Sequence, residues 1–167
     1  MSADLTLQRH VGRLYREHHG WLQSWLRQRL GCANEAADLA PDTFERLLAR
    51  RETATWAEPK AYLATIARGL VIDLYRRRDV ERAFLDALAT IPEHHHPSPE
   101  RRAELLQTLQ AVDAMLDGLP AAVREAFLLS QLEGQSYREI AERLRVTERT
   151  VANYMARAMG HCLALVA

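Results

Sequence analysis

The stretch that decides the fold is residues 136–162, which read SYREIAERLRVTERTVANYMARAMGHC. Apolar residues recur at helical spacing on both sides of a short break, which predicts two short helices with one apolar face each. These residues are Ile140, Ala141 and Leu144, followed by Val151, Met155 and Ala158. Ser136 and Glu139 fit a capping box, and Thr147 is a natural N-cap for the second helix. Two helices joined by about three residues are typical of the helix-turn-helix, whose second helix enters the DNA major groove.

The turn between these helices contains one unfavourable residue. Ala141 is small where the two helices would cross closely, and Val151 would fill the contact from the second helix. The turn favours Gly at position 145, where this chain has Arg145, and a left-handed non-glycine residue costs on the order of 1–2 kcal/mol. The same spacing also fits two packed helices of any all-α protein, so the motif alone leaves both interpretations open.

Length and composition limit the class of protein. A chain of 167 residues makes one domain of ordinary size or two small ones, and 48% apolar residues are enough for a packed core. No stretch approaches the roughly 20 apolar residues of a membrane span, and the N-terminus lacks the pattern of a signal peptide. Cys32 and Cys162 are isolated thiols. We therefore expect a reduced, cytoplasmic protein without a disulfide framework.

The net charge is zero, but acidic and basic residues are separated along the chain. Segment 60–82 has a local net charge of +3, from Lys60, Arg68, Arg76, Arg77, Arg78 and Arg82 against Asp73, Asp79 and Glu81. Segment 35–45 has no basic residue and contains Glu35, Asp38, Asp42 and Glu45. This separation favours two partners of different electrostatic character, although ordinary solvated helix surface would look the same.

Apolar periodicity predicts helices throughout the chain, with the fold class all-α. The expected helices cover 7–30, 35–49, 59–78, a short tail at 81–89, 101–116, 121–132 and the pair in 136–162. Pro41 fits the second helix if Asp38 caps it, because proline is tolerated in a first turn. Three prolines and a run of three histidines at 90–99 interrupt the helical pattern. The histidines, 94–96, would bind a metal only weakly by themselves. We therefore predict two small helical domains, 1–88 and 101–167, joined by a flexible linker, 89–100.

The C-terminal half of the 59–78 helix carries an aromatic residue among arginines. Arg68, Tyr75 and Arg76 to Arg78 are expected to be exposed, beside a loop that contains Trp56. Such a surface can hold phosphates and stack unpaired bases. Core aromatics beside a basic helix end, which suits the helix dipole, explain the same residues equally well.

Four segments in this order resemble the extracytoplasmic-function sigma factors of bacterial RNA polymerase, and most closely their iron-starvation subgroup. The segments are ADLAPDTFERLL at 37–48, PKAYLATIARGLVIDLYRRR at 59–78, LDGLPAAVREAFLL at 116–129, and the helix-turn-helix through His161 and Cys162. The resemblance extends from about Leu14 to Cys162. It implies control of siderophore and iron-uptake genes.

The resemblance also implies three sites, none of them catalytic and none holding a metal. Residues that would dock on the clamp helices of the polymerase β′ subunit are Asp38, Asp42, Phe44 and Glu45. Residues that would melt and read the −10 element are Trp56, Lys60, Arg68, Asp73, Tyr75, Arg76 and Arg77. Residues that would read the −35 duplex are Thr147, Glu148, Arg149, Thr150, Asn153, Tyr154 and Arg157. Arg145 and Ala152 depart from the family, since many relatives carry Gly and Lys there.

The leading hypothesis is therefore a promoter-specificity subunit without catalysis, cofactor or small-molecule substrate. Its partners would be core RNA polymerase (β′ clamp helices and β flap), promoter DNA and a membrane-anchored anti-sigma factor. The alternative is a helix-turn-helix regulator that binds duplex operator alone, as a dimer. Basic residues in both halves favour the first hypothesis, since a regulator needs them mainly at its reader helix. A small helical enzyme or scaffold has no supporting residues.

Overall fold

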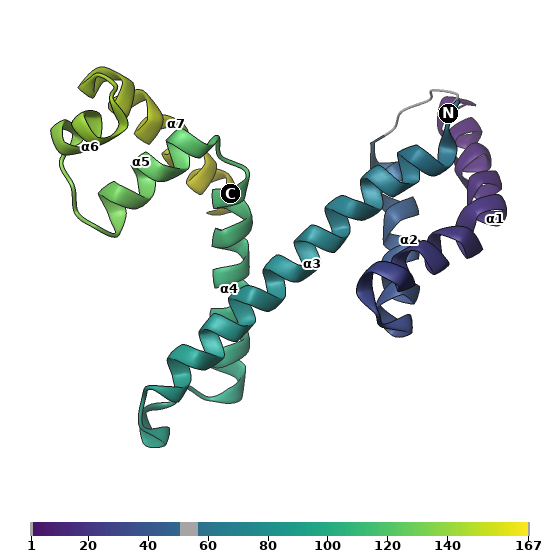
Figure 1. Ribbon diagram of the computed structural model, residues 1–167, viewed down its shortest axis with the longest axis horizontal. Coiled ribbons are helices and arrows are strands. Elements are labelled where there is room, and N and C mark those ends of the chain that lie inside the picture. The colour runs from purple at the N-terminus through teal and green to yellow at the C-terminus, as the bar shows by residue number, and fades with distance from the viewer. Residues whose placement is uncertain (1, 51–56, 167) are drawn as a thin grey trace. The chain divides into compact units, whose positions relative to one another are not determined.

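The computed structural model describes residues 2–50 and 57–166, with side chains for 5–50 and 57–164, and every regular element in this part is helical. The elements are α1 (Ser2–Leu30), α2 (Ala33–Ala49), α3 (Pro59–Ala89), a 3-10 turn (Glu93–His95), α4 (Pro99–Asp117), α5 (Ala121–Gln131), α6 (Tyr137–Leu144) and α7 (Glu148–Val166) (Figure 1). The all-α class is confirmed. By its internal contacts the chain divides into two units, Met1–Asp79 and Val80–Ala167.

The first unit packs α1, α2 and the first half of α3 around one hydrophobic core. Leu22, Leu26, Leu47 and Leu63 are at most 1% exposed. Burying a leucine side chain contributes roughly 1.5–3 kcal/mol, so these positions dominate the stability of the unit. The polar faces of the same three helices remain available for partners.

Helix α2 begins earlier than the sequence pattern predicts. Its N-cap is Cys32, in an extended conformation and without a side-chain cap hydrogen bond, so the cap predicted at Asp38 is wrong. Pro41 consequently lies inside the helix, where it removes one backbone hydrogen bond. Ala36 and Ala40 are fully buried in the core on this stretch. Their packing explains why the helix continues through a residue that would break it in isolation.

Helix α3 is continuous from Pro59 to Ala89, so the predicted interruption after Arg78 is wrong. The charged run 76–82 contains neither Gly nor Pro, and charged residues alone do not end a helix. Leu88, near the end of α3, is 7% exposed, and packing of this last turn favours the longer helix.

The chain between α3 and α4 is held by local hydrogen bonds. The ring of His96 lies 2.8 Å (Nε2) from the carbonyl of Ile91 and 3.0 Å (Nδ1) from the Arg102 guanidinium. A carbonyl can only accept and a guanidinium can only donate, so the proton of His96 is on Nε2. Arg102 also donates to the Pro97 carbonyl (3.1 Å), and Ser98 accepts from the Arg101 amide (3.2 Å) as N-cap of α4. One histidine of the run thus has a structural role.

The second unit contains the helix-turn-helix. Its main core consists of Ala126, Leu129, Ile140, Ala141, Val151 and Met155, from α5, α6 and α7. A smaller cluster contains Met115, Leu119, Val123 and Ala158. The sequence predictions that Ala141 lies at the helix crossing and that Val151 fills the contact are confirmed by their burial, at 6% and 0% exposed.

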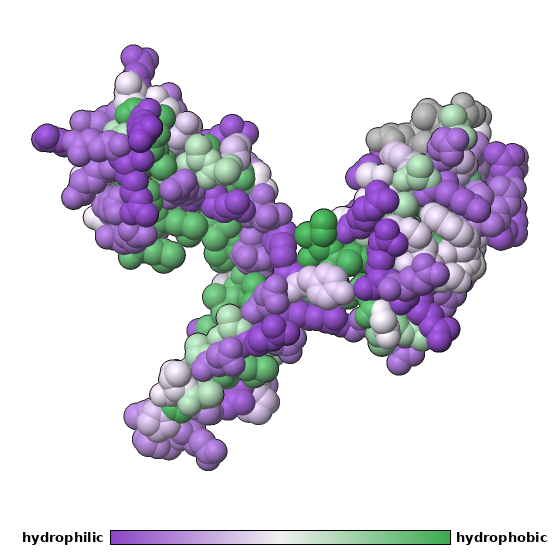
Figure 2. Space-filling model, viewed as in Figure 1, coloured by the Kyte–Doolittle hydropathy of each residue, from purple (hydrophilic) through white to green (hydrophobic). Residues whose placement is uncertain are grey.

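Apolar side chains remain exposed on α4. Leu109 and Val112 are 44% and 39% exposed, whereas Met115 is buried. Figure 2 shows hydrophobic surface along this helix. The apolar side chains of α4 are therefore only partly covered. Among the described residues, no helix is long and apolar enough to cross a bilayer.

Both predicted caps of the helix-turn-helix are confirmed. The Glu139 amide donates to the Ser136 hydroxyl (3.3 Å), and the Ser136 amide donates to the Glu139 carboxylate (2.7 Å). The Ser136 hydroxyl also bonds to this carboxylate (2.7 Å), and these bonds lower the pKa of Glu139. The Thr147 hydroxyl accepts from the Thr150 amide (3.2 Å), which caps α7.

The turn takes the left-handed conformation that the sequence predicts. Arg145 has φ 57° and ψ 44°, and the Val146 amide donates to the Ala141 carbonyl (3.0 Å), as in a Schellman motif. The other described residues with positive φ are glycines, Gly31 and Gly134. The left-handed conformation is unfavourable for arginine, so the packing of α6 against α7 must offset its cost.

Arg145→Gly is expected to stabilise the second unit by about 1 kcal/mol, because glycine adopts the left-handed conformation without a Cβ clash. The greater freedom of glycine in the unfolded chain offsets part of this gain. Urea denaturation followed by circular dichroism measures the change. Arg145→Ala is the control, since it removes the same side chain and retains the strain. Equal stability of the two variants would contradict the prediction.

Candidate nucleic-acid interface

Helix α7 presents a polar face in its first three turns. Arg149, Asn153 and Arg157 are exposed and follow one another at intervals of four residues, so they share one face. Thr147 and Glu148 are exposed at its start. Arginine and asparagine are the side chains that pair with guanine and adenine in the major groove. This face has the residue types and the accessibility that duplex recognition requires.

Two residues predicted for the same role are placed differently. Tyr154 is half-buried and packs against both hydrophobic clusters of the second unit. Thr150 is also half-buried, and its hydroxyl lies 2.9 Å from the hydroxyl of Thr147. Both side chains lie at the border between the apolar and polar faces of α7. They therefore help to hold the helix in place and are less accessible to DNA.

Helix α2 carries an exposed acidic edge, which we define as Asp38, Asp42 and Glu45. The spacing of four and three residues places these carboxylates along one side of the helix. In the described part of the chain none of them forms an ion pair, whereas nearby Glu35 pairs with Arg78. The edge therefore presents three carboxylates to a partner.

Phe44, predicted together with this edge, lies in the core instead. It is 4% exposed and contacts Tyr15 edge-on, with ring centroids 5.1 Å apart. Two residues along a helix correspond to a rotation of about 200°, so a side chain two positions after Asp42 points inward when Asp42 points outward. Phe44 thus anchors α2 in the core, while the acidic edge lies on the exposed side of the same helix.

The residues predicted on α3 divide into two groups. Lys60, Arg68, Tyr75 and Arg77 are exposed. Asp73 and Arg76 are half-buried and form an ion pair (3.7 Å), and Asp73 also pairs with Arg46 of α2 (3.5 Å). Asp73 therefore connects α3 to α2, and Arg76 pairs with it from the next turn of α3. Trp56 lies outside the described residues.

Helix α1 lies beside this part of α3 and adds aromatic rings to it. Trp21 and Trp25 have centroids 6.4 Å apart, and Lys60 Nζ lies 5.5 Å from the Trp21 ring. The Arg29 guanidinium carbon lies 3.6 Å from the centre of the Trp25 ring, and that of Arg68 lies 5.7 Å from it. We call these five residues the cation–aromatic strip.

The strip continues toward the C-terminal part of α3. The Tyr75 hydroxyl donates to the backbone carbonyl of Arg29 (3.4 Å), and the Arg78 guanidinium lies 5.9 Å from the Tyr75 ring. Cations within about 6 Å of a ring centre are attracted by its negative face. The contact between α1 and α3 therefore brings cations and aromatic rings together on one surface.

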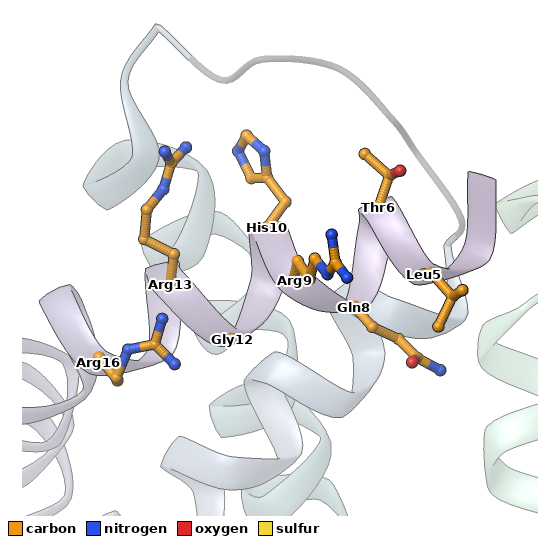
Figure 3. Close-up of a pocket in the computed structure, with 8 residues that line it drawn as sticks. All are labelled: Leu5, Thr6, Gln8, Arg9, His10, Gly12, Arg13 and Arg16. Carbon is orange, nitrogen blue, oxygen red and sulfur yellow. The ribbon is translucent and has the colours of Figure 1, made fainter. Parts of the chain in front are cut away.

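A second group of cations surrounds an open hollow of about 650 Å³ at the N-terminal end of α1. Figure 3 shows the side chains of Arg9, Arg13 and Arg16 around it, with Gly12 between them. The other lining residues are Leu5, Thr6, Gln8 and His10. Gly12 is half-buried, with the Arg16 guanidinium 3.9 Å from the place where a Cβ would lie, and the arginines make the hollow electropositive.

Comparison with known proteins gives the same family for both halves of the chain. The sigma-70 region 2 family matches residues 14–81, and the sigma-70 region 4 family matches residues 109–162. The ferric citrate uptake sigma factor FecI of Escherichia coli (strain K12) is 49% identical over 162 residues, covering 97% of this chain and 91% of FecI. The chain belongs to the sigma-70 family, in its extracytoplasmic-function group.

Two further similarities cover most of this chain. The ECF RNA polymerase sigma factor SigE of Mycolicibacterium smegmatis (strain ATCC 700084 / mc(2)155) is 31% identical over 163 residues, 93% of this sigma factor and 58% of SigE. Among solved structures, a chain of the RsbN–BldN complex is 25% identical, with 98% of this chain and 96% of that chain covered and a TM-score of 0.38.

The family confirms the resemblance found in the sequence. A sigma factor binds core RNA polymerase and promoter DNA and directs promoter-specific initiation, and it is not an enzyme. The region 2 match contains the acidic edge, most of α1 and the basic part of α3, and the region 4 match contains the exposed face of α7. These three surfaces thus lie in matched regions, whereas most of the arginine-lined hollow at the start of α1 precedes residue 14, where the region 2 match begins.

Sequence reasoning missed the α1 half of the cation–aromatic strip. Periodicity places Trp25 in the apolar stripe of α1, and it does pack on the core. The available signal was the spacing of Trp21, Trp25 and Arg29, which repeats every four residues and places them on one face. Spacing on one helix could not indicate that Lys60 and Arg68 lie against that face.

Proposed function

We propose that this sigma factor uses three separate surfaces to start transcription. The acidic edge of α2 docks on the clamp helices of the polymerase β′ subunit, the exposed cations of α3 bind the −10 element as it opens, and α7 reads the −35 duplex. The observation that carries the proposal is the presence of accessible cations in both units. In the described chain, Lys60, Arg68 and Arg77 of α3 have no carboxylate partner. They lie far in sequence from α7, so a protein that bound DNA through α7 alone would not need them.

The acidic edge fits a basic partner. Three carboxylates on one helix side, none compensated among the described residues, create a local negative potential that steers association with positive charge. The second unit provides the other contact with polymerase, at the β flap. Asp38, Asp42 and Glu45 are the docking residues, and Phe44 holds their helix in place.

The α3 surface fits an unpaired strand. Lys60, Arg68 and Arg77 supply charges for phosphates, and exposed Tyr75 supplies a ring for a base, the combination that single-strand-binding surfaces use. Asp73 and Arg76 act as a structural pair that orients α3. The role of Trp56 is proposed from the family resemblance alone.

The α7 surface fits a duplex. Arg149, Asn153 and Arg157 face outward with donors that can reach base edges or phosphates, and Thr147 and Glu148 lie at the helix start, where recognition helices contact bases. Ala152 removes the phosphate contact that a lysine would make at this position. Tyr154 and Thr150 maintain the helix orientation.

Arg149→Ala is expected to weaken −35 binding by about tenfold or more, because a good arginine contact to a base is worth roughly 1–3 kcal/mol. Electrophoretic mobility shift of the reconstituted holoenzyme on promoter duplex measures it. Arg101→Ala is the matched control, since Arg101 is exposed in the same unit but lies on α4 and pairs with Glu104. Equal promoter binding by both variants would remove Arg149 from the −35 site.

The regulon proposed here is iron or siderophore uptake. The 49% identity to a ferric citrate uptake sigma factor over nearly the full length of both chains supports it. A membrane-anchored anti-sigma factor is the proposed regulator and the cytoplasm the proposed location. The proposed division is a region 2 domain at 1–88, a linker at 89–100 and a region 4 domain at 101–167. Each family match lies inside one of these domains.

Run-off transcription tests the proposed function. Purified core RNA polymerase, with and without the protein, is given templates carrying promoters of ferric-siderophore uptake genes. New transcripts that depend on the protein are expected. Silence on these templates with transcripts from other promoters would reject the regulon. Silence on all templates, together with tight duplex binding by the free protein as a dimer, would favour the operator-binding regulator.

A further inference from the structure

We propose that α1 forms half of the single-strand-binding surface, with Trp21 and Trp25 holding Arg29, Lys60 and Arg68 in position to bind the phosphates of an unpaired DNA strand. This inference rests on the proposed role of α3 at the −10 element and extends it to a second helix. It assigns a phosphate-binding role to Arg29 and positioning roles to the two tryptophans.

The geometry assigns each cation to a ring. Lys60 faces Trp21 at 5.5 Å, and both Arg29 and Arg68 approach Trp25, at 3.6 Å and 5.7 Å. Trp21 and Trp25 are themselves half-buried and packed on the core of the first unit. The rings are therefore rigid supports, and the side chains that they hold extend toward solvent.

Contact with a ring restricts a cation without using its hydrogen-bond donors. A guanidinium has all five N–H groups in its own plane, so a ring on its face leaves the edges available for phosphate oxygens. Among the described residues, Arg29, Lys60 and Arg68 form no ion pair with a carboxylate. Three cations are thus oriented in advance, and less conformational entropy is lost when a strand binds.

The arrangement fits a single strand better than a duplex or an acidic protein. Duplex readers insert a helix or a β-ribbon into a groove, whereas this surface is formed where the sides of two helices, α1 and α3, meet. It continues to Tyr75, whose exposed ring provides a stacking surface beside the cations. A single DNA strand can contact the cations through its phosphates and the Tyr75 ring through a base. An acidic protein could contact only the cations.

The test measures binding of the reconstituted holoenzyme to fluorescently labelled oligo(dT) at several salt concentrations. Arg29→Gln is expected to lower affinity several-fold and to reduce the slope of log K against log salt by about 0.7, the value for one phosphate contact on a single strand. Arg27→Gln is the matched control. It lies in the same last turn of α1, experiences the same helix dipole and is exposed, but is rotated by about 200° from Arg29.

The positioning role of Trp25 needs a double-mutant cycle. Trp25→Leu preserves apolar packing and removes the aromatic face, and it is expected to weaken oligo(dT) binding several-fold. In the Arg29→Gln, Arg68→Gln background the same replacement should have little further effect, because the cations it positions are absent. A purely structural role would weaken binding equally in both backgrounds, and this result would overturn the positioning assignment. Circular dichroism melting confirms that each variant is folded.

The outcomes separate this inference from the proposed function. If Arg29→Gln behaves like Arg27→Gln while Lys60→Gln and Arg68→Gln weaken binding, α1 is not part of the surface and the −10 role of α3 stands. If none of these variants weakens binding, the −10 assignment itself is rejected and the α1 inference falls with it. Loss of duplex binding equal to the loss of oligo(dT) binding would also overturn the single-strand assignment.

Discussion

Asp42→Arg is expected to weaken binding to core RNA polymerase by a hundredfold or more and to abolish promoter-dependent transcription. Asp42 lies in the middle of the acidic edge, so the new charge would face the same partner cations as its neighbours Asp38 and Glu45. Placing like charges opposite each other at an interface costs several kcal/mol, and each 1.4 kcal/mol is about tenfold in affinity. The fold should be unaffected, because Asp42 is exposed and forms no ion pair in the described chain.

Titration of labelled protein with core polymerase measures this affinity directly. Glu17→Arg is the control, since it makes the same charge reversal on an exposed residue that belongs to α1 and not to the acidic edge. Of these two variants, only Asp42→Arg should lose affinity for core polymerase. A double charge reversal at Asp38 and Asp42 should lower this affinity further. Normal binding by Asp42→Arg would remove the acidic edge from the docking surface.

Ile140→Ala is expected to destabilise the second unit by about 2–5 kcal/mol, the usual cost of truncating a buried isoleucine. Ile140 is 0% exposed and lies in the cluster shared by α5, α6 and α7. A small domain is stable by only about 5–15 kcal/mol, so this loss is a large fraction of the total. Binding to −35 duplex should decline with it, because α7 is held in place by that cluster.

The three tryptophans make the location of this effect measurable. All three tryptophans fall within the sequence range of the first unit, 1–79, and Trp21 and Trp25 pack on its core. Tryptophan fluorescence therefore reports unfolding of that unit, whereas circular dichroism reports both. Ile140→Ala should lower the circular-dichroism midpoint in urea and leave the fluorescence midpoint unchanged. Leu132→Ala is the control, since Leu132 is 79% exposed in the same unit. Equal circular-dichroism midpoints for the two variants would contradict the assigned core.

Interactions that are local along the chain were predictable from the sequence by itself. The capping box of Ser136 and Glu139, the cap at Thr147 and the left-handed Arg145 involve residues at most five positions apart. Apolar spacing located the helix-turn-helix core, because the period of a helix fixes which residues share a face. The order of four motifs along the chain was enough to indicate the family, which the comparisons confirm.

Tertiary structure decided the features that depend on residues distant in sequence. Packing of α2 on the core carries that helix through Pro41 and turns Phe44 inward, and packing of α7 half-buries Tyr154. The approach of α1 to α3 brings Trp25 against Arg68 and the backbone of Arg29 against Tyr75. Helical periodicity shows which face of α1 is apolar but not which helix covers it. The exposed face of the recognition helix α7 could therefore be predicted from the sequence. The cation–aromatic strip could not, because it forms only when the folded chain brings two helices together.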